Sequence, residues 1–139
     1  MKFSDFDMEW LGIDSKGYLA RFTTAGRGWM PRNLNNYSVE YIFNELEFMD
    51  NLPSVSDSEF TDAKHACRDF EICCQKGVFI YDWTSVHGRT PQNENAYELV
   101  AIPTNPILAS SVIPNMASLI GVEFNGIEFL GTRYITENK

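Results

Sequence analysis

Strand-like and helix-like apolar patterns follow one another in blocks along this chain instead of alternating. Two short strand-like segments come first, two helix-like segments follow, and four strand-like segments complete the sequence. Regular alternation of strands and helices would indicate a parallel sheet, whereas separated blocks are typical of α+β domains. The order therefore predicts an α+β fold, ββ-αα-ββββ, with a mainly antiparallel sheet of about six strands packed with two helices.

The first two predicted strands are separated by a turn. Residues 9–14 (EWLGID) are apolar-rich, and residues 18–23 (YLARFT) alternate between two faces. Between them, a short polar side chain can bond to its own backbone and Gly17 can adopt a positive φ. We therefore expect a β-hairpin at the start of the chain.

The remaining strands are predicted after the helices. Residues 78–83 (VFIYDW) and 96–102 (AYELVAI) are expected to pair across a long polar loop. Near the end of the chain, IGVEF and IEFLG flank Asn125 and Gly126, the dipeptide that most favours a two-residue type I′ turn. These segments predict a second hairpin.

Apolar residues at helical spacing predict two helices. The first helix is expected over residues 38–50, with Ser38 or a nearby asparagine as its N-cap. The second is expected to begin between residues 57 and 61 and to run to residue 76, with Gly77 as a left-handed C-cap. The predicted core positions are Val39, Ile42, Phe43, Leu46 and Met49 on the first helix, and Phe60, Ala63, Cys67, Phe70 and Cys74 on the second.

Length and charge limit the classes of function. The chain has 139 residues, which suits a single globular domain over residues 1–139. The net charge of −8 and the scattered basic residues argue against a nucleic-acid partner. An acidic surface favours encounter with a basic partner, although it also serves ordinary solubility. The absence of a signal-like or membrane-spanning apolar segment predicts a cytoplasmic location and no membrane partner.

The cysteines predict neither a disulfide framework nor a metal site. Cys67, Cys73 and Cys74 are odd in number and lie within the second predicted helix. On that helix His65 would point away from Cys67 and Cys74, so these side chains could not converge on one ion. We expect no metal, and we expect Cys73 to be the partly exposed thiol.

The Gly-x-Gly loop in TTAGRGW raises the question of phosphate binding. Gly26 and Gly28 lack the third glycine and the immediate helix start that a dinucleotide fingerprint requires. The simpler interpretation is a tight connector whose Trp29 packs on the domain. No motif of a known catalytic nucleophile or metalloprotease is present. We therefore predict no catalytic residue, no cofactor and no enzyme; the alternative is a nucleotide enzyme using Gly26 to Gly28 with His87 as base.

The first predicted helix carries a second aromatic stripe nearly opposite its core stripe. This stripe consists of Tyr37, Tyr41, Asn44 and Phe48, and it is bordered by Glu40, Glu45 and Glu47. Such a helix either is sandwiched inside the domain, or it presents a docking surface. Aromatic anchors ringed by carboxylates suit a basic protein partner, because the rings supply buried area and the charges supply steering. The candidate partner-binding residues are therefore Tyr37, Tyr41, Phe48, Glu40, Glu45 and Glu47.

Three stretches of the chain resemble a known family. DMEWLGIDSKGYLARFTTAGRGWMP, KGVFIYDW and AYELVAIPTNPI are similar to segments of small bacterial immunity proteins, and of uncharacterised cytoplasmic domains, from polymorphic toxin systems. The matching motifs cover about a third of the chain. The matching positions are Trp10, Asp14, Gly17, Phe22, Gly26, Gly28, Pro31, Gly77, Tyr81 and Asp82.

The resemblance implies a role and no catalytic residues. It implies a stoichiometric inhibitor that binds a cognate toxin made in the same cell, and a basic toxin domain is the expected partner. The alternative is a regulatory or scaffold interaction domain in the style of the SUKH superfamily, whose members include immunity proteins and cellular regulators.

Overall fold

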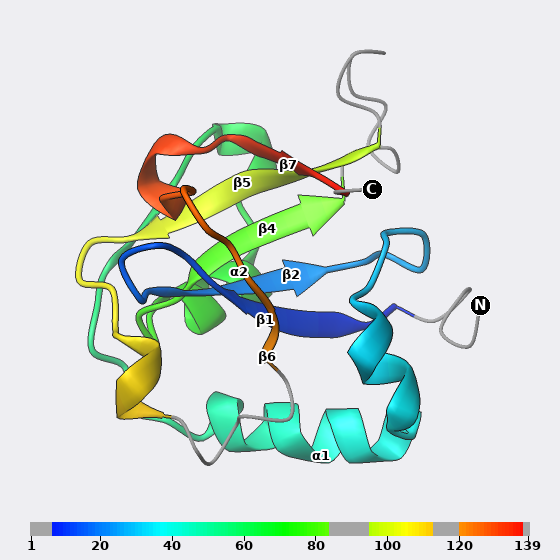
Figure 1. Ribbon diagram of the computed structural model, residues 1–139. Coiled ribbons are helices and arrows are strands. Elements are labelled where there is room, and N and C mark those ends of the chain that lie inside the picture. Colours follow the sequence, from blue (N-terminus) through cyan, green and yellow to red (C-terminus); the bar gives the residue numbers. More distant parts are fainter. Residues whose placement is uncertain (1–6, 84–94, 113–119, 138–139) are drawn as a thin grey trace.

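The computed structural model describes residues 7–83, 95–112 and 120–137. Its α-helices are α1 (Val39–Asp50) and α2 (Arg68–Cys74). Its sheet contains seven strands in the order β3-β5-β4-β2-β1-β6, with β7 also paired to β5. The strands are β1 (Glu9–Ile13), β2 (Leu19–Thr23), β3 (Ser58–Phe60), β4 (Phe79–Trp83), β5 (Ala96–Pro103), β6 (Ile120–Glu123) and β7 (Tyr134–Thr136). The α+β fold is thus confirmed (Figure 1).

The predicted first hairpin is confirmed. β1 and β2 pair antiparallel, with Trp10 opposite Phe22, and Gly17 takes a φ of 87° in the turn. Asp14 organises this turn, because its Oδ1 accepts hydrogen bonds from the backbone N–H groups of Lys16 (3.0 Å) and Tyr18 (2.9 Å). The pairing of β4 with β5 is also confirmed.

The sheet is mixed, whereas the sequence predicted a mainly antiparallel one. β1 pairs with β6 and β2 pairs with β4 in parallel, and the remaining pairings are antiparallel. The chain leaves β2, passes through both helices and returns beside β2 in the same direction. A long helical connection of this kind joins parallel strands, so the block of helices acts as a crossover.

The second predicted helix is much shorter than expected. Residues 58–60 form β3, which pairs with β5, and a 3-10 turn at Ala63–His65 follows. The side chain of Asp62 accepts from the N–H of Lys64 at 3.0 Å and so caps that turn. The observed order is therefore ββ-α-β-α-ββββ. Of the predicted core stripe, Cys74 is fully buried, Phe60 and Phe70 are partly buried, and Ala63 and Cys67 are exposed.

The predicted C-terminal hairpin is wrong. Asn125 and Gly126 do form a turn, in which Gly126 has a φ of 76°. The next segment forms a 3-10 turn at Phe129–Gly131 instead of a strand, and the chain then enters β7. Phe129 is fully buried, and its N–H donates to Asp14 Oδ2 at 3.0 Å. Burial of this ring overrides the local preference for a hairpin.

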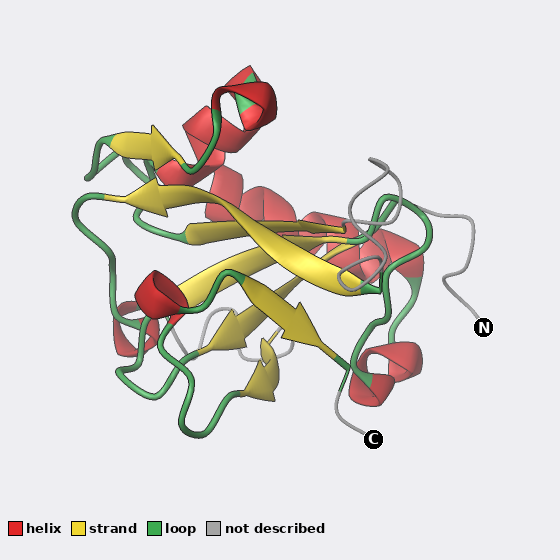
Figure 2. Cartoon of the chain, turned by 90° about the horizontal axis from the view of Figure 1, so that it is seen from above, coloured by secondary structure: helices red, strands yellow, loops and turns green. Residues whose placement is uncertain are grey.

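The buried apolar side chains of the sheet and the helices form one core cluster. One face carries stacked aromatic rings, with Trp10 and Phe22 centroids 4.0 Å apart and Phe22 and Tyr81 centroids 4.9 Å apart. α1 lies along the β1 and β6 side of the sheet, and α2 packs near β4 and β5 (Figures 1 and 2). α1 buries Ile42, Leu46 and Met49, and these residues hold it against the domain.

Candidate functional site

The aromatic and acidic stripe predicted on the first helix lies on the outside of α1, except that Tyr37 precedes the helix, at the end of the 3-10 turn Arg32–Asn36. Phe48 is 41% exposed and Asn44 is exposed, while Tyr37 and Tyr41 are partly buried. The rings of the two tyrosines contact each other, with centroids 5.0 Å apart. The helix is therefore not sandwiched inside the domain. We call Tyr37, Tyr41, Phe48, Glu40, Glu45 and Glu47 the α1 face.

One predicted core residue of α1 also lies outside. Phe43 is 46% exposed, although the sequence placed it in the core stripe. The buried stripe runs through Ile42, Leu46 and Met49, with Val39 partly buried beside it. The helix is thus rotated about its axis relative to the prediction, and Phe43 lies at the margin of the buried stripe. α1 therefore exposes two phenylalanines.

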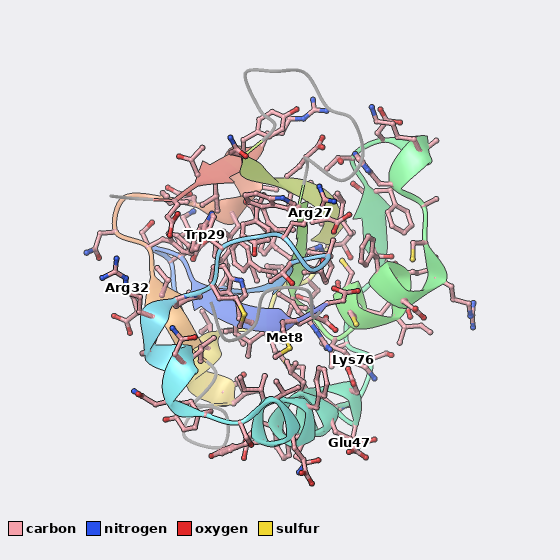
Figure 3. All side chains as sticks on the ribbon, turned by 90° about the vertical axis from the view of Figure 1, so that its right-hand side faces the viewer. Met8, Arg27, Trp29, Arg32, Glu47 and Lys76 are labelled. Atoms are coloured by element: carbon pink, nitrogen blue, oxygen red, sulfur yellow. The ribbon has the colours of Figure 1, made fainter. Side chains whose placement is uncertain are left out.

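The charge on α1 is of one sign. The helix contains Glu40, Glu45, Glu47 and Asp50 and no lysine or arginine. Asp50 pairs with Arg21, but the three glutamates form no ion pair with any residue in the part of the chain that the structure describes. Glu47 lies on the outer side of the helix (Figure 3). The helix thus lacks the i,i+4 pairs of opposite charge that stabilise many exposed helices.

Local features explain why this segment is helical. Ser38 has extended backbone angles, and its Oγ accepts from the N–H of Tyr41 at 3.0 Å, so it is the predicted N-cap. Glu40 in the first turn suits the positive end of the helix dipole. Asp50 in the last turn is unfavourable at the negative end of the helix dipole. Its ion pair with Arg21, at 2.8 Å, offsets this unfavourable interaction.

The Gly-x-Gly loop is a packed connector. Its N–H groups are all used within the loop and its neighbours: Ala25 donates to Asp7 Oδ1, Gly26 donates to Thr24 Oγ1, and Arg27 and Gly28 both donate to the carbonyl of Thr24. An anion-binding loop would instead direct these groups outward. The alternative base, His87, lies outside the described residues.

Packing explains the second glycine of this loop. A Cβ on Gly28 would overlap the hydroxyl of Tyr97, which donates to the carbonyl of Trp29 at 2.7 Å. Trp29 contacts Trp10 and Tyr97, with ring centroids 5.1 Å and 5.3 Å away. As the sequence predicted, Trp29 packs on the domain, and Gly28 leaves room for the Tyr97 hydroxyl that bonds to it.

A cavity that the sequence did not predict surrounds Arg21. It has a volume of about 540 Å³ and opens between the end of α1, α2 and the ends of β1, β2 and β4. Arg21 is 4% exposed; its Nε lies 2.5 Å from Glu9 Oε1, and its Nη1 lies 2.8 Å from Asp50 Oδ1. Burial opposes the charge of Arg21, but Glu9 and the other neighbouring anions outweigh it and raise the pKa of the guanidinium. We call this space the Arg21 cavity.

A second cluster of ionisable side chains, centred on buried Glu98, joins three distant segments. Glu98 on β5 is 1% exposed, and its Oε2 lies 3.1 Å from Arg133 Nη2 and 3.4 Å from His65 Nε2. Arg133 precedes β7, and His65 ends the 3-10 turn before α2. The cluster thus connects the β7 segment and the turn before α2 to the first half of β5.

The three thiols differ in their surroundings. Cys67 is exposed, Cys73 is partly buried beside Arg21, and Cys74 is fully buried. Burial raises the pKa of Cys73 and raises that of Cys74 to about 12. Cys67 is therefore the most exposed thiol, where the sequence indicated Cys73. Across the described ranges, no group of three or more His, Cys, Asp or Glu side chains could hold a metal ion.

These surroundings predict a strict order of thiol modification. With iodoacetamide at pH 8, Cys67 should be alkylated first, Cys73 more slowly, and Cys74 only after unfolding, because the thiolate reacts and a raised pKa lowers its fraction. Peptide mass spectrometry at successive times measures this order. Rapid alkylation of Cys74 in the native protein would contradict it, and complete alkylation in urea is the control.

Comparisons with protein-family models, with curated proteins and with solved structures found no match for this chain. Among the described residues, no helix has both the length and the apolar character needed to cross a bilayer.

Proposed function

We propose that this protein is a non-catalytic binding module that attaches to a basic protein partner through the α1 face. The observation that carries the proposal is a cluster on and beside α1. It combines exposed Phe48, partly exposed Tyr41 with Tyr37 just before the helix, and three glutamates that have no ion-pair partner among the described residues. A partner that carries lysine and arginine would neutralise the glutamates, and it would cover the rings.

The energetics of interfaces favour this arrangement. Exposed aromatic side chains supply most of the binding energy at many interfaces, and a charged rim raises the association rate and selects the partner. Like charges on one helix face contribute nothing favourable to the isolated helix. Their attraction to a basic surface is gained only in the complex. Glu40 also suits the helix dipole, whereas Glu45 and Glu47 gain a favourable electrostatic role only in binding.

The partner we propose is a toxin made in the same cell. The opening segment, KGVFIYDW and AYELVAIPTNPI resemble immunity proteins of polymorphic toxin systems, and the net charge of −8 suits inhibition of a basic toxin domain. In this proposal the protein acts in the cytoplasm, binds the toxin with one-to-one stoichiometry and covers its active surface. Catalysis has no part in it.

Affinity capture with matched variants tests this proposal. Tagged wild-type protein should retain a basic polypeptide with a toxic C-terminal domain from lysate of the source organism. Tyr41→Ala combined with Phe48→Ala should lose most of that polypeptide, because truncation of two anchors costs about 2–4 kcal/mol of binding. Leu130→Ala is the control, since Leu130 is a 67% exposed apolar residue outside the α1 face. Mass spectrometry identifies and quantifies the retained protein.

Coexpression decides whether binding protects the cell. Cells that express the captured domain should stop growing, and the wild-type protein should restore their growth, whereas the Tyr41→Ala, Phe48→Ala variant should not. Capture of a housekeeping protein with no toxic domain would contradict the immunity role and favour a SUKH-like regulatory domain. Equal capture by the variant and by wild type would place the interface elsewhere on the protein.

A further inference from the structure

The Arg21 cavity has two chemically different walls. Phe70, Ile72 and Cys73, from α2, form an apolar wall, and Ile72 is 40% exposed. The polar part of the lining contains Arg21, Thr23, Asp7, Glu9, Asp50 and Asp82 from other parts of the chain, and Asp69 from the first turn of α2. An apolar strip that leads to carboxylates matches a long aliphatic side chain with a cationic end, because such side chains lay their stems on apolar surface.

The described lining of the cavity is strongly negative. Among the described residues that line it, Arg21 is the only basic one, against five carboxylates, so their formal charge is −4 (five negative charges and one positive). Arg21 is already shared between Glu9 and Asp50. Asp7 and Asp69 have no ion-pair partner within the described part of the chain. A cation that entered the cavity would therefore be attracted to them.

Arg21 supplies a second signal, independent of the carboxylates. Its Nε bonds to Glu9 and its Nη1 bonds to Asp50, but Nη2 has no hydrogen bond to any described residue. The Arg21 side chain is only 5% exposed, but the fully buried polar atoms without a partner do not include Nη2. Nη2 therefore belongs to the small exposed part of the side chain. This donor therefore reaches the open space of the cavity. It would be satisfied by a ligand that brings an acceptor, such as a carbonyl oxygen.

We propose that the Arg21 cavity binds a lysine or arginine residue. The aliphatic stem lies along Phe70 and Ile72, the cation lies among the carboxylates of Asp7 and Asp69, and the carbonyl oxygen accepts from Arg21 Nη2. The chemistry is the same for a residue in a polypeptide and for a free amino acid. The site does not include the α1 face, so it stands or fails separately from the proposed function.

Titration followed by NMR of the 15N-labelled full chain tests the site. The probe is arginine blocked as its N-acetyl, N-methylamide derivative, and the control is norleucine with the same blocking groups, which keeps the stem and carbonyl but lacks the cation. The amides of Thr23 and of residues 69–73 should shift saturably with the arginine probe, at least about tenfold more tightly than with norleucine, at low ionic strength. Free arginine distinguishes the sources: tighter binding than the blocked probe indicates a small-molecule ligand, and weaker binding indicates a polypeptide.

A matched pair of variants on α2 localises the binding. Asp69→Asn removes a lining charge and should weaken the arginine probe about two- to fivefold, whereas Glu71→Gln removes a charge outside the cavity lining and should leave the affinity unchanged. Three results would overturn the proposal: equal affinity for norleucine, no saturable shift, or no effect of Asp69→Asn. Shifts confined to α1 would also overturn it and would assign the cation to the α1 face.

Discussion

Phe22→Ala is expected to lower the free energy of unfolding by about 3–5 kcal/mol, the usual range for removing a buried phenylalanine ring. Phe22 is fully buried and contacts five other aromatic rings, of Trp10, Tyr81, Tyr97, Phe124 and Phe129. Removal of the Phe22 ring therefore breaks contacts with β1, β4 and β5 and with the segment that follows β6. Urea unfolding followed by tryptophan fluorescence measures the change.

Phe48→Ala is the matched control for this prediction, because it removes the same ring from the α1 face. It should change the free energy of unfolding by less than about 0.5 kcal/mol, as is usual for surface substitutions. A large loss of stability in Phe48→Ala would show that its ring belongs to the core. The α1 face would then lose its aromatic anchor.

Arg21→Ala is expected to lower the free energy of unfolding by about 2–4 kcal/mol, since it removes two charge-assisted hydrogen bonds and leaves two carboxylates close together. The side chains of Glu9 and Asp50 are 31% and 52% exposed, so water can reach both of them after the change. This access keeps the cost below that of a fully buried pair.

Arg68→Ala gives the comparison for Arg21→Ala. Arg68 is 82% exposed, and its contact with Glu71 is 3.9 Å long, so its removal should cost at most about 0.5 kcal/mol. Urea unfolding of both variants measures the two changes in the free energy of unfolding. Equal and small effects would mean that Arg21 does not hold α1 to the sheet.

The parts of the fold that the sequence predicted correctly depend on local signals. Gly17 permits the first turn and Ser38 caps α1, and both act within a few residues of their own position. The C-terminal segment failed because a distant interaction decides it: the N–H of Phe129 bonds to Asp14, 115 residues away. β3 was missed for a similar reason, since its three residues are a strand only through pairing with β5.

The two candidate sites differ in the same way. All members of the α1 face except Tyr37 lie on one helix, so helical periodicity places them without knowledge of the rest of the fold. The Arg21 cavity is lined by residues of β1, β2, β4, α1 and α2, so it exists only once the sheet order is known. The sequence did contain one indication of this site. Arg21 shares a face of its strand with Leu19 and Thr23, opposite the face of Phe22, so a charged residue was expected within a strand-like apolar segment.

The dissociation constant of the captured partner tests most directly whether the α1 face is the binding surface. Calorimetric titration should give a value for the Tyr41→Ala, Phe48→Ala variant at least about thirtyfold weaker than for wild type, equivalent to about 2 kcal/mol. Leu130→Ala should bind as wild type, and added salt should weaken the wild-type complex. An unchanged dissociation constant in the α1 variant, with its fold intact, would contradict the proposed interface.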